Sequence, residues 1–154
     1  MPYRPRHFII QELVCPHVHT QFGEVAWQFF DDKLLITLDM LRDQLGPIYV
    51  NSWDMTKAKR DKAGIKEYTQ RGLRCTMCQL VKDAVQNNRV YMSPHITSQG
   101  VDLDVKGMTA AQVRLWITKN YIKMPFPVRL EKSVNWVHID VRDAGQGQVY
   151  LFNP

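Results

Sequence analysis

The sequence predicts an α+β protein in which an antiparallel sheet is flanked by helices. Leucines recur at helical spacing between residues 34 and 45, which indicates an amphipathic helix in the first half of the chain. Apolar and polar residues alternate strictly over 100–105 and 136–141, which indicates half-buried strands in the second half. No repeat or low-complexity segment interrupts the 154 residues, so we expect a single domain over residues 1–154.

In the first half of the chain, helix signals are followed by a clear stop. The expected elements are a short helix over 8–14, a loop around 17–19, a helix over 31–44 and a strand over 48–50. Asp31 or Asp32 is a good N-cap for the long helix, because a carboxylate accepts hydrogen bonds from free backbone N–H groups. Gly46 and Pro47 end that helix.

The second half begins with a polar segment and then becomes rich in strands. Residues 54–70 carry many lysines and are expected to form an exposed loop. The elements expected after it are a helix over 78–86, a strand over 100–105, a helix over 109–117, and strands over 136–141 and 149–152. Thr109 is a suitable N-cap, and Pro125 and Pro127 break the chain after that helix.

Composition narrows the class of partner. A formal net charge of +5 and a pI of about 9.2 favour polyanionic partners in general. The basic residues are dispersed and form no stripe interleaved with aromatic residues, so the signal for nucleic-acid binding is weak. An anionic bacterial cell wall fits the same charge equally well. No apolar run approaches the ~20 residues of a membrane span, and the first ten residues lack a signal-peptide core.

The chain has three cysteines, Cys15, Cys75 and Cys78. This odd, low number does not predict a disulfide framework, and we expect reduced structural thiols. The spacing of Cys75 and Cys78 also suits a redox pair or, together with Cys15 and His17, part of a second zinc site. His17 and His19 are expected to be ordinary loop residues.

The alternation places reactive side chains on one face of each strand. Asp102 and Asp104 share the polar face of the first strand, and His138 lies on the polar face of the second. If the two strands are antiparallel neighbours, facing side chains lie about 5 Å apart at Cβ, which suits a shared metal. With His95 just upstream, two imidazoles and one carboxylate are the ligands of an open zinc site. The alternation alone leaves Asp102 and Asp104 equivalent.

Two short segments carry a resemblance to a known family. The first is Ser93-Pro94-His95, followed by Ser98, Gly100 and Asp102, and the second is Trp136-Val137-His138-Ile139-Asp140. This pattern resembles the zinc D,D-peptidases of bacterial cell walls, which include D-Ala-D-Ala carboxypeptidases and phage endolysin endopeptidases and share a fold with hedgehog signalling domains. The family has Gly and Ala where this chain has Ser98 and Gly100. Looser likeness at 47–53 and 70–74 extends the resemblance over roughly residues 34–153.

The resemblance implies roles for individual residues. His95, Asp102 and His138 would be the zinc ligands, which selects one of the two aspartates. Arg74 would hold a carboxylate or carbonyl of the substrate, since a guanidinium is suited to oxyanions. Ser93 would form a hydrogen bond with the substrate near the metal.

The chain departs from the family at the general base. Many members have Glu three residues before the last histidine ligand and some have His two before it, but here these positions are Asn135 and Trp136. Hedgehog-like members have Glu six residues before that histidine, and Glu131 lies seven before it. We expect Glu131 to be the catalytic base, with Asp140 and Asp104 as alternatives on the polar strand faces.

These residues predict a zinc-dependent peptidase that hydrolyses an amide bond in peptidoglycan stem peptides. It would be either a D-Ala-D-Ala carboxypeptidase or an endolysin-type endopeptidase. Without a recognisable signal peptide, it is expected to be made in the cytoplasm and to reach the cell wall by phage-type release or in a virion. Two alternatives stay open: a non-catalytic zinc-containing binding module on the same fold, and a basic protein associated with nucleic acid.

Overall fold

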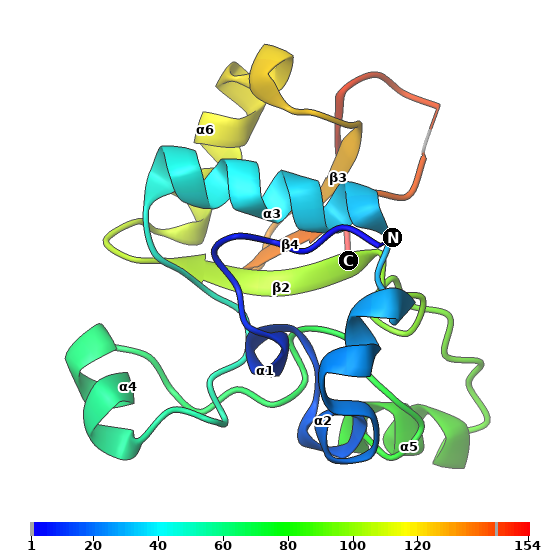
Figure 1. Ribbon diagram of the computed structural model, residues 1–154. Helices are drawn as coiled ribbons and strands as arrows, with labels where there is room; N and C mark the ends of the chain where they lie inside the picture. Colours follow the sequence, from blue (N-terminus) through cyan, green and yellow to red (C-terminus); the bar gives the residue numbers. More distant parts are fainter. Residues whose placement is uncertain (1, 144) are drawn as a thin grey trace.

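Helices surround a central sheet in the computed structural model, which describes residues 2–143 and 145–154 (Figure 1). The helices are α1 (Ile10–Leu13), α2 (Pro16–Phe22), α3 (Asp32–Leu45), α4 (Lys57–Ala63), α5 (Gln79–Gln86) and α6 (Ala110–Lys119), with the 3-10 helices η1 (Gly23–Phe29) and η2 (Tyr121–Lys123). The strands are β1 (Ile48–Tyr49), β2 (Gly100–Val105), β3 (Val128–Glu131), β4 (Val137–Asp140) and β5 (Val149–Phe152). The structure confirms the α+β class.

The strands form a five-stranded sheet in the order β1-β2-β4-β3-β5. β1 and β4 pair antiparallel with β2, and β3 pairs antiparallel with β4. The last pair differs from the expected antiparallel sheet, because β5 runs parallel to β3. The chain reverses direction once after β4 and passes β3 to reach its free edge, so the edge strand must run in the same direction as β3.

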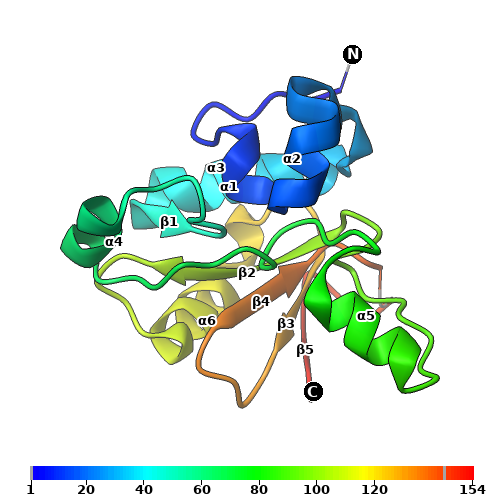
Figure 2. The same ribbon diagram turned by 90° about the horizontal axis from the view of Figure 1, so that it is seen from below.

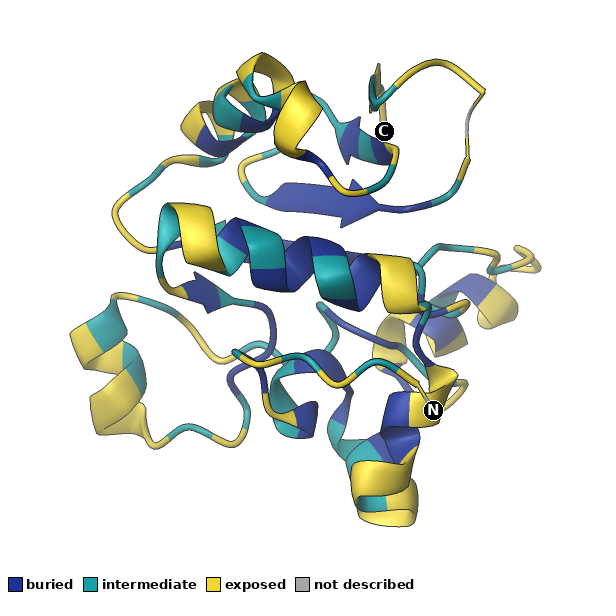
Figure 3. Ribbon diagram, turned by 45° about the horizontal axis from the view of Figure 1, so that its top comes forward, coloured by how far each residue is buried: buried dark blue, intermediate teal, exposed yellow. Residues whose placement is uncertain are grey.

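The hydrophobic core includes the apolar side of α3 and the apolar face of the sheet. Figure 3 shows α3 buried or partly buried along its middle and exposed only towards its two ends. Leu34 and Leu38 of α3 join Val101 and Leu103 of β2 in one buried cluster that draws on both halves of the chain. Burying a leucine side chain contributes about 1.5–3 kcal/mol to stability. Figure 2 shows α1, α2 and α3 gathered on the same side of the sheet.

The helix ends follow the sequence signals. The carboxylate of Asp31 accepts a hydrogen bond from the backbone N–H of Lys33 at 3.0 Å and caps α3, and Gly46 ends α3 with φ +86°. Thr109 caps α6 in a capping box with Gln112. Within the described residues, none of these helices is long and apolar enough to cross a bilayer.

Three segments differ from the sequence prediction. The loop predicted at 17–19 is wrong, because α2 occupies it and Pro16 starts that helix, where a missing N–H is harmless. The loop predicted at 54–70 contains α4, which Thr56 caps and Gly64 ends in the left-handed conformation. Strand β3 has no sequence prediction, since four residues directly after a proline give too little alternation.

Candidate metal centre

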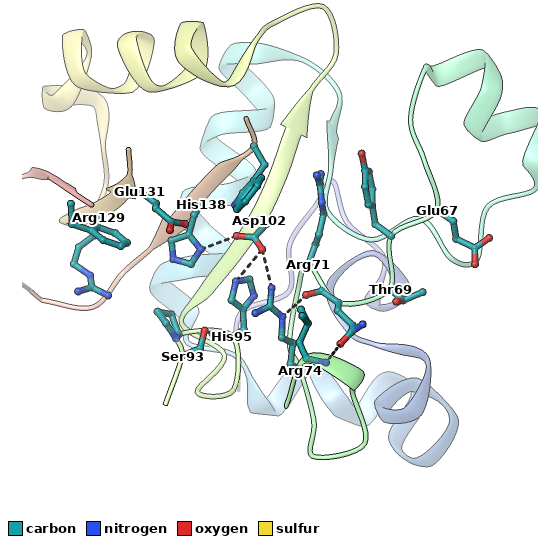
Figure 4. A pocket seen from close by; sticks show the side chains of 16 residues that line it. Glu67, Thr69, Arg71, Arg74, Ser93, His95, Asp102, Arg129, Glu131 and His138 are labelled. Atoms are coloured by element: carbon teal, nitrogen blue, oxygen red, sulfur yellow. Dashed lines mark hydrogen bonds and ion pairs between the residues drawn. The ribbon is translucent and has the colours of Figure 1, made fainter. Parts of the chain in front are cut away.

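Two neighbouring strands and a loop bring three polar side chains together. Asp102 of β2 and His138 of β4 are direct partners in the antiparallel register, and His95 lies in the segment that precedes β2. One ligand-type atom from each of the three residues lies within 4.8 Å of the others. The alternation of the two strands predicts this convergence, because it places Asp102 and His138 on the same face of adjacent strands (Figure 4).

Asp102 lies at the middle of this group. Its Oδ1 is 2.8 Å from Nδ1 of His138, and its Oδ2 is 3.3 Å from Nε2 of His95. The guanidinium of Arg74 donates a hydrogen bond to the same Oδ2 at 2.9 Å. His95, Asp102 and His138 are 2%, 9% and 6% exposed, so little water competes for these contacts.

The other nitrogen of each imidazole is held from outside the group. Nδ1 of His95 donates a hydrogen bond to the carbonyl oxygen of Gly72 at 2.9 Å. Nε2 of His138 lies 3.1 Å from Oδ2 of Asp140, and Arg129 donates two hydrogen bonds to that carboxylate at 2.7 and 3.0 Å. Outer partners of this kind fix the orientation of histidine ligands in metal sites.

Hydrogen bonding sets the charge of the group. Burial alone would raise the pKa of Asp102, but hydrogen bonds from His138 and His95 outweigh it and hold that pKa well below its usual range. Burial would lower the pKa of His138, but its hydrogen bonds to Asp102 and Asp140 raise it to about 9. Burial is the main reason that the pKa of His95 is lowered. The metal-free group therefore combines one carboxylate, one imidazolium and one neutral imidazole at neutral pH.

This donor set fits a divalent metal ion. Two imidazole nitrogens and one carboxylate oxygen are typical zinc ligands where one coordination position stays open to water. The nitrogens that face the group, Nε2 of His95 and Nδ1 of His138, are those that no outer partner fixes. The three residues could therefore hold a metal, and this mixture of nitrogen and oxygen ligands suits zinc well.

The candidate metal centre opens onto a cleft with a volume of about 680 Å³. The lining includes Arg71, Arg74, Ser93, His95, Asp102, Arg129, Glu131, Trp136, His138 and Phe152. The lining holds three arginines and three acids, and each of the three arginines forms an ion pair with an aspartate of the protein. Figure 4 shows Glu131 on the same side of the cleft as His138.

The two residues predicted to bind substrate lie at the cleft and have partners within the protein. The guanidinium of Arg74 donates hydrogen bonds to Asp102, to the carbonyl of Gln70 and to the hydroxyl of Tyr91. The hydroxyl of Ser93 accepts a hydrogen bond from the backbone N–H two residues further on, at 3.3 Å. Their part in substrate binding stays a prediction.

The three acids considered for the general base lie in different environments. Glu131 lines the cleft and is partly exposed. Asp140 is fully buried beside His138 and is paired with an arginine. Asp104 forms an ion pair with Arg71 at 2.6 Å and lines a separate cavity. The geometry therefore favours Glu131 over the other two, and its role as a base stays a prediction.

Arg129 and Tyr91 have structural roles at the site that the sequence did not suggest. Arg129 fixes the carboxylate that orients His138, and Tyr91 accepts a hydrogen bond from Arg74. The apolar residues Val128 and Leu130 flank Arg129 in the sequence. This short alternation is the sequence signal that could have predicted a strand with Arg129 on its polar face. The short length of that segment hides the signal.

Comparison of the chain with protein-family models, with curated proteins and with solved structures found no match.

Proposed function

We propose that this chain is a zinc-dependent peptidase that hydrolyses an amide bond in peptidoglycan stem peptides. The observation that carries the proposal is the convergence of His95, Asp102 and His138 at the wall of an open cleft that Glu131 also lines. Two imidazoles and one carboxylate leave room for a water at the metal, which is the arrangement of a catalytic rather than a structural zinc site.

The backbone around the motif supports the family resemblance. Ser98 has φ +56°, in the left-handed region, and it occupies the position where the family has Gly. Gly100 departs from the family, because the family has Ala at this position and a Cβ here would approach Asp140 and Pro94 to within 2.8 Å. We propose a hedgehog-like zinc fold because the motif occupies a loop and two antiparallel strands, as the resemblance implies.

Each residue of the cleft has a role in this proposal. Bound by His95, Asp102 and His138, zinc would polarise the scissile carbonyl and lower the pKa of a bound water. The Glu131 carboxylate accepts a proton from the attacking water and donates it to the nitrogen of the leaving amine. Arg74 holds a carboxylate or carbonyl of the stem peptide, which positions the amide bond for attack.

Other features of the site fit the same substrate. Ser93 would form a hydrogen bond with the peptide backbone beside the metal. The net charge of +5 favours association with an anionic cell wall. We further propose that the protein reaches the wall as a phage-type lytic enzyme or as part of a virion.

Incubation of the zinc-loaded protein with peptidoglycan fragments tests the proposal, with mass spectrometry of the products to show which amide bond is cut. The Glu131→Gln variant should keep its zinc and lose activity by about 10²–10⁴-fold, the usual contribution of a general base. Glu67→Gln is the matched control, because Glu67 also lines the cleft but pairs with Arg60 at 2.8 Å. Zinc-loaded protein that cleaves no wall peptide would reject the peptidase.

A non-catalytic zinc-containing binding module is the second candidate. It is favoured by Asn135 and Trp136, which occupy the two positions where most family members place an acid or a histidine. This candidate predicts that the same fragments bind to the zinc-loaded protein without hydrolysis. Binding that persists in Glu131→Gln while both proteins lack turnover would support it.

A further inference from the structure

A second group of metal-binding side chains lies apart from the cleft, between the N-terminal helices and the start of α5. Cys15 and His17 come from the start of α2, and Cys75 and Cys78 come from the turn before α5. One ligand-type atom from each of the four residues lies within 4.8 Å of the others. Cys15 and Cys78 are buried, and His17 and Cys75 are partly exposed.

The separations are within a few tenths of an ångström of those between ligands around one zinc ion. Sγ of Cys75 lies 3.6 Å from Sγ of Cys15, 4.0 Å from Sγ of Cys78 and 3.7 Å from Nδ1 of His17. Nδ1 of His17 lies 4.0 Å from Sγ of Cys78. Tetrahedral zinc, with bonds of about 2.3 Å to sulfur and about 2.0 Å to nitrogen, separates its ligand atoms by about 3.5–3.8 Å.

We propose that Cys15, His17, Cys75 and Cys78 bind a structural zinc ion. Three thiolates and one imidazole complete a tetrahedral shell and leave no position for water, which is the arrangement of structural zinc sites. The backbone N–H of Cys75 points to Sγ of Cys78 at 3.4 Å, so the turn already supplies a donor to a negatively charged sulfur. His17 was expected to be an ordinary loop residue, but it lies in helix α2, which turns its side chain toward the thiols.

A redox pair explains fewer of these residues. The sulfurs of Cys75 and Cys78 are 4.0 Å apart, against about 2.05 Å for a disulfide. A disulfide between any two of the three cysteines would not explain why the third cysteine and His17 lie beside it. Zinc uses all four side chains, and all three cysteines of the chain belong to this group.

The proposed zinc site would hold together two distant parts of the chain. Beside it, the backbone of Leu73 pairs with that of Val14, with Leu73 N–H donating to the Leu13 carbonyl at 2.8 Å and Cys15 N–H donating to the Leu73 carbonyl at 3.2 Å. Gly72 and Arg74 flank this pair, and both contact the candidate metal centre in the cleft. The zinc site would therefore hold in place the segment whose residues form hydrogen bonds with His95 and Asp102. An effect of this zinc site on catalysis rests on the proposed function; the zinc site itself does not.

Zinc content and cobalt absorption test the site without any measurement of activity. Protein purified under reducing conditions should hold one zinc at the thiolate site, and this ion should remain in the His138→Ala variant, which disrupts only the cleft. Cobalt substitution should give a thiolate-to-cobalt charge-transfer band in the near ultraviolet. The proposed ligands in the cleft include no thiolate and cannot produce such a band. The band therefore reports on the cysteine site alone, whether or not the cleft binds zinc.

Variants at residue 17 sharpen the test. His17→Ala should lose zinc to a chelator roughly tenfold faster or more, whereas His17→Cys replaces one zinc ligand with another and should retain the ion and strengthen the charge-transfer band. His19→Ala is the matched control, because His19 is in the same helix but packs against Trp53, with 5.5 Å between ring centroids. If His17→Ala fails to fold, the His17→Cys spectrum still decides. Reduced wild-type protein without a thiolate band, or a native mass that shows a disulfide and no zinc, would overturn the proposal.

Discussion

Replacement of Arg129 by methionine should destabilise the protein by about 3 kcal/mol. The Asp140 carboxylate is fully buried and accepts two hydrogen bonds from side-chain nitrogens of Arg129 at 2.7 and 3.0 Å. Nε2 of His138 and the backbone N–H of Arg142 each lie 3.1 Å from the same carboxylate. Removing one partner of a buried ion pair destabilises proteins by about 3–5 kcal/mol, because the other charge is left uncompensated. The lower end of that range applies, because His138 and the backbone N–H of Arg142 still contact Asp140 in the variant. The Arg129 side chain is also 23% exposed, so water can enter the vacated space.

Urea unfolding of wild type and Arg129→Met measures this change. Arg142→Met is the matched control, because among the described residues the Arg142 guanidinium donates to the Met92 carbonyl and the Thr97 hydroxyl at the surface. This control should change stability by no more than about 0.5 kcal/mol. Arg129→Met should also bind zinc in the cleft about 10–100-fold more weakly, because Asp140 would no longer hold His138 in a fixed orientation.

The pH dependence supplies a further check on the same pair. Burial would raise the pKa of Asp140, but its hydrogen bonds with His138 and Arg129 lower it. A carboxyl group whose pKa is lowered by folding stabilises the protein above its unfolded pKa and loses that contribution as the pH falls. The stability difference between wild type and Arg129→Met should therefore narrow below about pH 4. A loss in Arg129→Met no larger than that in Arg142→Met would refute the reasoning.

Three other predictions concern the cleft and the backbone around it. Zinc affinity at the cleft should rise with pH up to about 9, because zinc displaces the proton that His138 holds below its raised pKa of about 9. Calorimetric titration at several pH values measures this affinity, and a constant affinity would contradict the prediction. Gly100→Ala should lower stability by about 1–3 kcal/mol in thermal unfolding, since the new Cβ meets Pro94 Cβ at 2.7 Å; an unchanged transition would show that the strands can separate locally. Ser98→Gly should leave stability unchanged or raise it by up to about 1 kcal/mol in the same thermal unfolding assay, because glycine adopts the left-handed conformation of residue 98 without strain. A clear loss of stability would mean that the buried hydroxyl contributes more than the strain costs.

The sequence was sufficient where a side-chain pattern repeats within one element. Alternation in β2 and β4 predicted that Asp102 and His138 share a face, and the structure pairs them directly. The leucine spacing of α3 likewise reflects one continuous buried side. Such patterns can be read without tertiary information because burial acts at a fixed period along the chain.

Relations between distant segments were not available from local patterns. His17 lies 58 residues before Cys75, and only the folded arrangement of α2 turns the imidazole toward the thiols. Arg129 was missed because its strand is four residues long and follows a proline. The exposed segment around α4 was predicted as a loop because lysines favour solvent in either conformation, while their helix propensity is also high.

Because Asp102 pairs directly with His138, the site depends on the register of β2 and β4 and not on the length of the connection between them. These residues are 36 positions apart, and the connection between them contains α6 and β3, so its length can change without moving either side chain. A slip of a single residue between β2 and β4 would instead send one of the two to the apolar face of the sheet. Insertions between the strands should therefore be tolerated far better than insertions within them.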